Sequence, residues 1–227
     1  MAPVFSIAVL LYPGADVMDF SGPVEIFSTR PQPGEPEFKI TTFAHNSPVK
    51  AGALVYVPHA SFAEVESRLE EYDILVVPGA HPDMLKTFIP SEEGKQIAGL
   101  VRRFAGLKPR GETGYRVVQS VCTGALLLAA SGILAGRTVT THHIAYDALK
   151  QVADQAAGGE SGVNVVRKRW VDAGITEAGV RIVNAGGVTS GIDASLWVVE
   201  LLVGKERAAL MAEVAEFERR GEEGWGV

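Results

Sequence analysis

Cysteine is nearly absent from this sequence of 227 residues, which contains only Cys122. A single cysteine excludes an internal disulfide and any zinc site built on paired cysteines, and it favours a reducing compartment. Basic side chains are also outnumbered, because 21 Lys and Arg stand against 27 Asp and Glu, for a formal net charge of −6. That balance argues against a nucleic-acid partner, which calls for basic patches. The five histidines show no metal-ligand spacing, so we expect no metal site.

Long hydrophobic runs are missing as well. The N-terminal segment MAPVFSIAVLLYPG lacks a basic start, and its apolar run is too short for a signal peptide or a membrane span. We therefore expect a cytoplasmic protein without a membrane partner. Hydrophobic residues make up 47% of the chain, which supplies a sizeable core without staples. No repeat or long internal linker divides the chain, so we expect one domain over residues 1–227.

Predicted strands and helices alternate along the chain. The apolar runs Phe5–Tyr12 and Tyr72–Val77 are typical of parallel strands buried on both faces, and Ser91 is expected to cap a helix through Phe104. The other predicted strands are Glu37–Ala44, Arg137–Thr141, Asn164–Val171 and Arg181–Ala185, with hairpin character over Val49–Pro58. The other predicted helices are Val24–Ser28, Ala63–Glu71, Ile144–Val152, Ile192–Val203 and Lys205–Arg220, and Arg30–Pro36 is predicted to be a surface loop. The alternation predicts an α/β fold with a doubly wound, mostly parallel sheet, whose site lies at the carboxyl ends of the strands.

The stretch around Cys122 organises the sequence. Tyr115–Val121 mixes aromatic and β-branched residues, which predicts a buried strand, and the small apolar residues after Cys122 predict a helix that ends at Gly132. A strand that passes into a helix through one residue forms a tight elbow, where backbone N–H groups and the positive end of the helix dipole converge. We expect a thiol there to have a lowered pKa. The alternative is a buried, inert cysteine.

The sequence SVCTGALLLAASGILAGRTVTTHH resembles the nucleophile-elbow region of the ThiJ/PfpI superfamily, the relatives of class I glutamine amidotransferases. The motifs DFSGPVEIF, VVPGA and NAGGVTSGIDASLWVVELL extend that resemblance over most of the chain. It implies a flavodoxin-like sandwich and a homodimer, for which the apolar stripe of Lys205–Arg220 would be a contact surface. Within the superfamily, the CTG elbow and the TTH that ends twenty residues later are most similar to the isocyanide hydratase branch.

The resemblance implies roles for residues near the elbow. Asp19 corresponds to a carboxylate beside the cysteine, and we expect it to act as a general acid/base with a raised pKa, because a neighbouring thiolate repels its charge. The alternative is that Asp19 only caps a helix. The N–H groups of Gly79 and Ala80 are expected to form an anion-binding pocket with those of Cys122 and Thr123. The alternative for the Gly79–Ala80 pair is a plain turn.

Further positions leave alternatives open. Asp16 is the weaker acid/base candidate. His142 or His143 belongs either to a Cys–His dyad or to a strand end on the pocket rim. Gly187 either packs a helix on the sheet or forms a pocket wall. Thr123 stands where proteolytic and glyoxalase-type members carry His, which counts against both activities, and its hydroxyl is expected to orient a water or a substrate.

Together these features predict a cofactor-independent lyase that hydrates a small-molecule isocyanide to an N-substituted formamide. Cys122 attacks the terminal carbon, Asp19 supplies a proton, and a water positioned by Asp19 or Thr123 releases the product. The alternatives are a glyoxalase or deglycase acting on small oxoaldehydes, and a non-catalytic redox-sensing or ligand-binding protein. Regulators with the same elbow carry a helix-turn-helix region after it, and because this chain ends at Val227 we expect none here.

Overall fold

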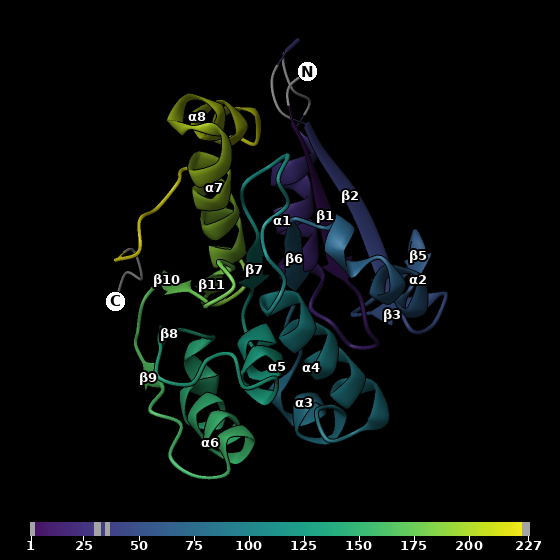
Figure 1. Ribbon diagram of the computed structural model, residues 1–227, viewed down its shortest axis with the longest axis vertical. Coiled ribbons are helices and arrows are strands. Elements are labelled where there is room, and N and C mark those ends of the chain that lie inside the picture. The colour runs from purple at the N-terminus through teal and green to yellow at the C-terminus, as the bar shows by residue number, and fades with distance from the viewer. Residues whose placement is uncertain (1–2, 30–32, 35–36, 224–227) are drawn as a thin grey trace.

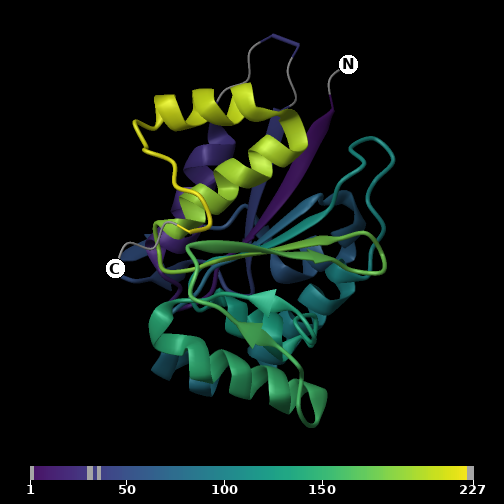
Figure 2. The ribbon, with the colours of Figure 1, turned by 90° about the vertical axis from the view of Figure 1, so that its left-hand side faces the viewer.

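A seven-stranded sheet forms the centre of the molecule, in the strand order β10-β11-β7-β6-β1-β2-β5. The computed structural model describes residues 3–29, 33–34 and 37–223, so most of the predicted loop Arg30–Pro36 lies outside the described residues. Every neighbouring pair of strands is parallel except β10 with β11. Helices cover both faces of the sheet (Figure 1), with α7 and α8 on one side and α5 and α6 on the other (Figure 2). The predicted doubly wound α/β fold is confirmed.

The sheet consists of β1 (Val4–Leu10), β2 (Glu37–Ala44), β5 (Ala60–Ser61), β6 (Ile74–Val77), β7 (Val117–Ser120), β10 (Trp170–Ile175) and β11 (Arg181–Ala185). Two small pairs lie outside it: the predicted hairpin, formed by β3 (Val49–Ala51) and β4 (Leu54–Tyr56), and β8 (Thr138–Val139) with β9 (Asn164–Val165). The helices are α1 (Val17–Ser28), α2 (Phe62–Ser67), α3 (Pro82–Phe88), α4 (Glu92–Ala105), α5 (Gly124–Ala130), α6 (Tyr146–Ala157), α7 (Ser190–Val203) and α8 (Lys205–Val214), with 3-10 turns at Leu69–Glu71 and His143–Ala145.

The central strands are buried because their side chains are apolar on both faces. Ile74–Val77 is fully buried along its length, and β7 beside it is buried as well. Since β1, β6 and β7 run in parallel, their carboxyl ends lie along one edge of the sheet. The segments that follow these strands are therefore neighbours in space, and they contain Asp19, Gly79 and Cys122.

Two helices near this edge differ from the sequence prediction. α1 begins at Val17 rather than Val24, because the Asp16 side chain caps it by accepting the Met18 N–H at 3.0 Å. Pro23, which directly precedes the predicted helix, lies buried inside the observed one. α3 was not predicted. It begins directly after the His81 cap with Pro82, a residue that suits the first helical turn.

The C-terminal helix is shorter than predicted and is buried on a different face. α8 ends at Val214 instead of Arg220, and its buried side chains are those of Arg207, Ala208 and Met211. The predicted apolar stripe consists of Leu210, Val214 and Phe217, and of these Val214 is 62% exposed. The stripe is therefore not a continuous apolar surface, because the chain leaves the helix before Phe217.

Candidate active site

Cys122 lies at a tight elbow between β7 and α5. Its backbone φ is +56°, a left-handed conformation that is strained for a residue with a side chain. Backbone bonds hold it there: the Cys122 N–H donates to the Gly186 carbonyl at 2.8 Å, and the Cys122 carbonyl accepts the Thr141 hydroxyl at 2.8 Å. Gly124 lets the helix approach the sheet, since a Cβ there would lie 2.3 Å from the Val77 oxygen. The structure thus contains the elbow that the sequence predicts, and the cysteine is 7% exposed.

Asp19 lies in the first turn of α1 and is completely buried. Its Oδ2 accepts the Gly79 N–H at 2.9 Å. Its Oδ1 is buried and has no N–H or O–H partner in the described part of the chain, and the carboxyl group lies next to the Cys122 thiol. Asp16 is the N-cap of this helix, so the interpretation of Asp19 as the cap is wrong.

The electrostatics of Asp19 agree with the prediction in direction but not in cause. Burial raises the pKa of Asp19 to about 7, and the charge of Asp16 adds to that rise. Hydrogen bonds from the Gly79 N–H and the Cys122 thiol oppose it. Desolvation therefore accounts for the raised pKa, and repulsion by a thiolate does not.

The expected lowering of the thiol pKa is wrong. Burial, followed by the charge of Asp19, raises the pKa of Cys122 to about 12. The N–H groups of Thr123 and Val188 and the Thr123 hydroxyl act in the opposite direction, but burial outweighs them. The resting site therefore holds a protonated thiol beside a carboxyl group that titrates near neutral pH.

The peptide groups of Gly79 and Ala80, which follow β6, orient Asp19 and Thr123. The Ala80 N–H donates to the Thr123 hydroxyl at 2.9 Å, and that hydroxyl donates to the Ala80 carbonyl at 2.6 Å. The N–H of Gly79 is taken by Asp19, and that of Cys122 by the protein backbone. The predicted anion pocket is therefore wrong in composition, because of its four N–H groups only that of Thr123 hydrogen-bonds the sulfur.

Gly79 and Thr123 fit each other closely. A Cβ at Gly79 would lie 2.4 Å from the Thr123 hydroxyl oxygen, so only glycine allows this approach. Because the Thr123 hydroxyl accepts the Ala80 N–H and donates its proton to the Ala80 carbonyl, it is held in place and that proton is not available to a water. It is also close enough to lower the thiol pKa. The structure therefore brings together Asp19, Gly79, Ala80, Cys122 and Thr123.

His142 and Gly187 contact each other beside this cluster. A Cβ at Gly187 would lie 2.7 Å from the imidazole carbon Cδ2, so Gly187 makes room for the ring. Burial and the neighbouring His143, whose ring stacks at 4.4 Å, lower the pKa of His142 against the opposing charge of Asp16. The His142 Nδ1 accepts the Ile144 N–H at 3.3 Å, so this nitrogen is not available to the thiol.

Sequence reasoning missed several residues that shape the site. The Tyr12 hydroxyl donates to the Pro78 carbonyl at 2.8 Å, which fixes the peptide whose N–H reaches Asp19. A tyrosine at the carboxyl end of an apolar strand was the available signal, because a buried hydroxyl needs a partner. Val188 was missed because nothing in the sequence indicates its positive φ of 40°. Thr141 lies within the TTH motif, yet its bond to the Cys122 carbonyl depends on tertiary packing.

The raised thiol pKa predicts slow alkylation at neutral pH. Iodoacetamide should modify Cys122 slowly at pH 7, and the rate should still be rising well above pH 8.5, the range of an ordinary thiol, because the thiolate is the nucleophile. The measurement is the alkylation rate from pH 6 to pH 10 by intact mass, with the denatured chain as reference. A plateau already reached at pH 7 would contradict the assignment.

The raised pKa of Asp19 also predicts a pH-dependent cost to stability. The folded chain keeps the Asp19 proton up to about pH 7, whereas the unfolded chain loses it near pH 4. The contribution of this group to the free energy of unfolding is therefore fully present below about pH 4 and is lost as the pH rises to about 7. Asp19→Asn should therefore gain stability relative to the native chain between about pH 4 and pH 7, by about 1.4 kcal/mol per unit of pKa difference. Urea unfolding at pH 4.5 and pH 8 measures this. An identical difference at both pH values would refute it.

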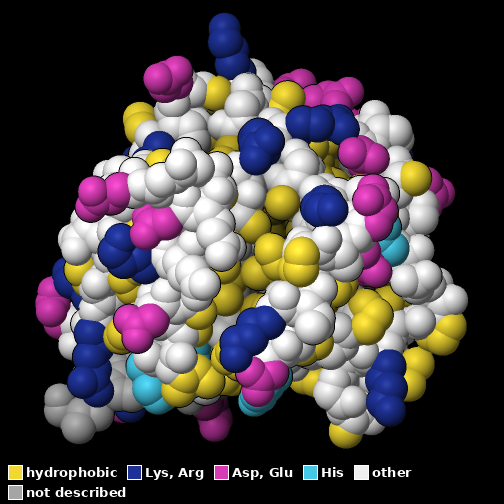
Figure 3. Space-filling view, turned by 90° about the horizontal axis from the view of Figure 1, so that it is seen from below, with side chains coloured by type: hydrophobic (Ala, Val, Ile, Leu, Met, Phe, Trp, Pro, Cys, Tyr) yellow, Lys and Arg dark blue, Asp and Glu magenta, His cyan; other side chains and the backbone are white. Residues whose placement is uncertain are grey.

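Apolar side chains also line a furrow outside this cluster, between α3, α5 and α6, which Figure 3 shows in yellow. Its volume is about 260 Å³, and its lining includes Leu85, Ile89, Leu126 and Val152 but neither Asp19 nor Cys122. Over residues 3–29, 33–34 and 37–223, no group of three or more His, Cys, Asp or Glu side chains is placed to hold a metal. The helices described are all too short or too polar to cross a membrane.

The fold and this site define an α/β protein with a cysteine elbow and a buried carboxylate at the carboxyl edge of a parallel sheet. Residues 5–192 match the DJ-1/PfpI family, and the chain belongs to that family. It is 26% identical to the isonitrile hydratase of Pseudomonas putida over 211 residues, which are 93% of this chain and 78% of that protein.

Solved structures agree with this assignment. A THiJ/PfpI family protein from Pseudomonas syringae superposes with a TM-score of 0.71 at 25% identity, over 98% of this chain and 79% of that one. DJ-1 of Schizosaccharomyces pombe gives a TM-score of 0.68 at 18% identity, over 94% of this chain and 100% of that one, which shows the shared fold. The predicted resemblance and the flavodoxin-like architecture are confirmed.

Proposed function

We propose that this protein is a cofactor-independent lyase that hydrates an isocyanide to an N-substituted formamide. The observation that carries the proposal is the buried pair of Asp19 and Cys122. Burial holds the carboxyl pKa at about 7 and keeps the thiol protonated, so one proton is available to move between them. The similarity to an isonitrile hydratase over most of the chain supports the same reaction.

The first step uses the terminal carbon of R–N≡C, which accepts both a nucleophile and a proton. The Asp19 carboxylate, which lies next to the thiol, takes the thiol proton as the Cys122 sulfur bonds to the carbon. The same carboxyl then delivers that proton to the carbon, giving the thioimidate R–N=CH–S–Cys122. No net charge is created, and Asp19 ends the step as a carboxylate.

The second step hydrolyses the thioimidate. The Asp19 carboxylate takes a proton from a water whose oxygen adds to the carbon, and passes that proton to the nitrogen. In the resulting R–NH–CH(OH)–S–Cys122 the carbon–sulfur bond breaks, the hydroxyl proton passes through Asp19 to the sulfur, and R–NH–CHO is released. The Thr123 and Val188 N–H groups, which hydrogen-bond the sulfur, stabilise it as it leaves.

Two observations weigh against the alternatives. The residue after Cys122 is threonine, held by Ala80, so no imidazole follows the thiol as it does in glyoxalase-type relatives. Redox-sensing cysteines have low pKa values and are solvent-accessible, whereas this thiol is buried and its pKa is raised.

The test is turnover by the purified protein. An aryl isocyanide should be consumed with loss of its absorbance, and one equivalent of the matching formamide should appear by chromatography and mass spectrometry. Methylglyoxal is offered in parallel, and Cys122→Ser is the control for non-enzymatic hydrolysis. Consumption of methylglyoxal without formation of a formamide would overturn the proposal in favour of a glyoxalase.

We also propose that the protein is cytoplasmic and forms a homodimer. The lone thiol, which has no disulfide partner within the chain, supports a reducing compartment. For the dimer, the hairpin β3–β4 is a better contact surface than α8, because Leu54 is 50% and Val55 65% exposed. Light scattering at micromolar concentration should give twice the chain mass of 24.1 kDa, and Val55→Lys should shift it toward one. A single chain mass for the native protein would refute the dimer.

A further inference from the structure

The segment 186–189, between β11 and α7, forms one wall beside the Cys122 sulfur. Val188 in this segment adopts a φ of +40°, an unusual conformation for a β-branched residue. Its N–H hydrogen-bonds the thiol and lowers the thiol pKa, as the Thr123 N–H does. A strained backbone persists only where its surroundings hold it. The structure must therefore contain groups that fix this segment.

Arg169 fixes the segment at both ends. Its carbonyl accepts the Gly186 N–H at 2.8 Å, and its guanidinium Nη2 donates to the Thr189 hydroxyl at 3.1 Å. The Gly186 carbonyl accepts the Cys122 N–H at 2.8 Å, so the segment that Arg169 holds also contacts the backbone of the elbow. Arg169 is only 6% exposed. Val188 lies between the two anchored ends.

Asp193 and the end of the chain hold Arg169 in turn. The Asp193 Oδ2 accepts the Arg169 Nε–H at 2.5 Å, and Asp193 is completely buried in α7. Its Oδ1 accepts the Arg220 N–H at 2.6 Å, and the Arg169 N–H donates to the Glu222 carbonyl at 2.9 Å. Both oxygens of this carboxylate are therefore used to join three separate segments of the chain.

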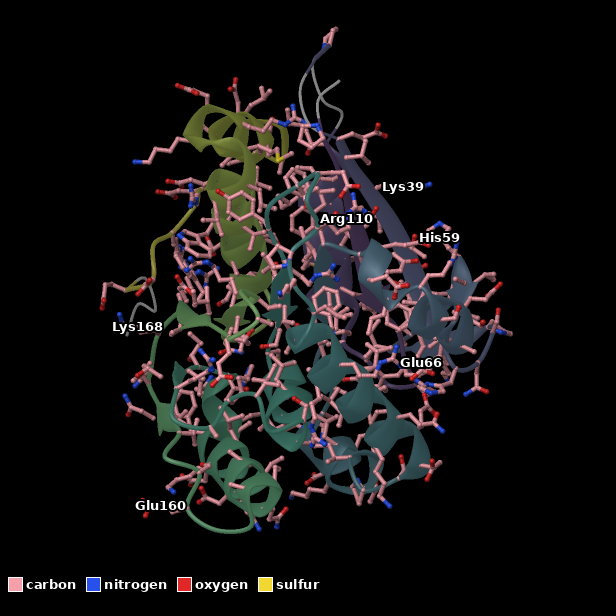
Figure 4. The ribbon with its side chains drawn as sticks, in the orientation of Figure 1. Lys39, His59, Glu66, Arg110, Glu160 and Lys168 are labelled. Carbon is pink, nitrogen blue, oxygen red and sulfur yellow. The ribbon has the colours of Figure 1, made fainter. Side chains whose placement is uncertain are left out.

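The C-terminal segment covers this ion pair. Figure 2 shows the segment after α8 running back along α7 to the edge of the sheet at β10. Lys168, labelled in Figure 4, binds it by ion pairs to Glu222 at 3.0 Å and Glu223 at 2.9 Å. The segment therefore lies next to the buried pair that fixes the wall beside the thiol.

We propose that Arg169 is a positioning residue for the thiol, acting with Asp193 and the C-terminal segment to hold residues 186–189 so that the Val188 N–H faces Cys122. A buried ion pair is weak evidence for stability, because desolvation offsets the attraction of its charges. The pair of Arg169 and Asp193 is joined to both ends of the strained segment 186–189. It therefore has a more specific effect, which is to place the Val188 N–H beside the sulfur. The inference concerns the reactivity of the thiol and does not depend on the substrate.

The test is the rate of Cys122 alkylation between pH 7 and pH 9 in full-length point variants. Arg169→Lys keeps a positive charge but loses the fork that reaches Thr189, and Thr189→Val removes only the accepting hydroxyl. Loss of the Val188 donor should raise the thiol pKa and slow alkylation, by about tenfold for one pKa unit in Arg169→Lys and by less in Thr189→Val. Thr189→Ser keeps the hydroxyl and should restore the native rate.

Arg116→Lys is the matched control. Arg116 is also buried and bonds several carbonyls, but it precedes β7, at the opposite end of the strand from Cys122. We expect it to cost stability in urea without slowing alkylation. Unchanged or faster alkylation in both Arg169→Lys and Thr189→Val would overturn the proposal, and so would equal slowing in Arg116→Lys. If Arg169→Lys fails to fold, the Thr189→Val and Thr189→Ser comparison decides the question alone.

Discussion

Replacing Cys122 with alanine should abolish isocyanide hydration while leaving the fold intact. The proposed reaction passes through a bond between the sulfur and the substrate carbon, and no other described side chain at the site is a nucleophile of that kind. Alanine keeps the Cβ and the backbone conformation of the elbow, so only one sulfur atom is lost from a buried position. The free energy of unfolding should change by about 1 kcal/mol or less.

The measurement is the turnover rate of Cys122→Ala against that of the native chain, with circular dichroism and urea unfolding as the control for folding. Cys122→Ser is the second variant, because it keeps a hydrogen-bonding group at the elbow but is a far weaker nucleophile. If either variant retains more than a few per cent of the native rate, the covalent mechanism is wrong.

Asp19→Asn should slow hydration on the order of a hundredfold or more and yet make the thiol easier to alkylate at pH 8.5. The change removes the carboxylate that carries the thiol proton from sulfur to carbon, which accounts for the loss of rate. It also removes a negative charge that raises the thiol pKa, so more thiolate is present. The Asn oxygen still accepts the Gly79 N–H, so the fold is kept.

Asp16→Asn is the matched control for this variant. Asn caps a helix about as well as Asp, so α1 should persist, and the only change near Asp19 is the loss of one neighbouring charge. We expect turnover close to native in Asp16→Asn. Opposite changes in turnover and alkylation for Asp19→Asn assign it to the chemistry. A variant that loses both, or neither, would assign it to the fold.

The sequence predicted the strands and the elbow that form this site, because local residue patterns determine those elements. Apolar runs such as Tyr72–Val77 are typical of central parallel strands, and parallel strands bring the segments after them to one edge. The abrupt change of pattern at Cys122 predicted the elbow. Ser91 was a correct N-cap because its hydroxyl accepts the Gly94 N–H at 3.1 Å, a bond made within one turn of the helix.

The electrostatics of the site were not predictable in the same way. The thiol pKa depends on how deeply Cys122 is buried and on the charge of Asp19, which is distant in the sequence, and the two together reverse the effect of the elbow N–H groups. The helix predicted from Val24 begins at Val17 and contains Pro23, which is buried by the rest of the fold. The partners of the Gly79 and Ala80 N–H groups lie on other segments, so only the folded chain shows that both are occupied.

The most direct test of the central claim is to trap the covalent intermediate. Native protein is mixed with an aryl isocyanide, quenched in acid within the first turnovers, and analysed by intact mass and peptide mapping. Asp19→Asn is included because its slower reaction should prolong any adduct. The account predicts a mass gain equal to one whole isocyanide molecule, located on Cys122, that disappears as formamide forms. Formamide production at the native rate with Cys122 unmodified at every time point would contradict it.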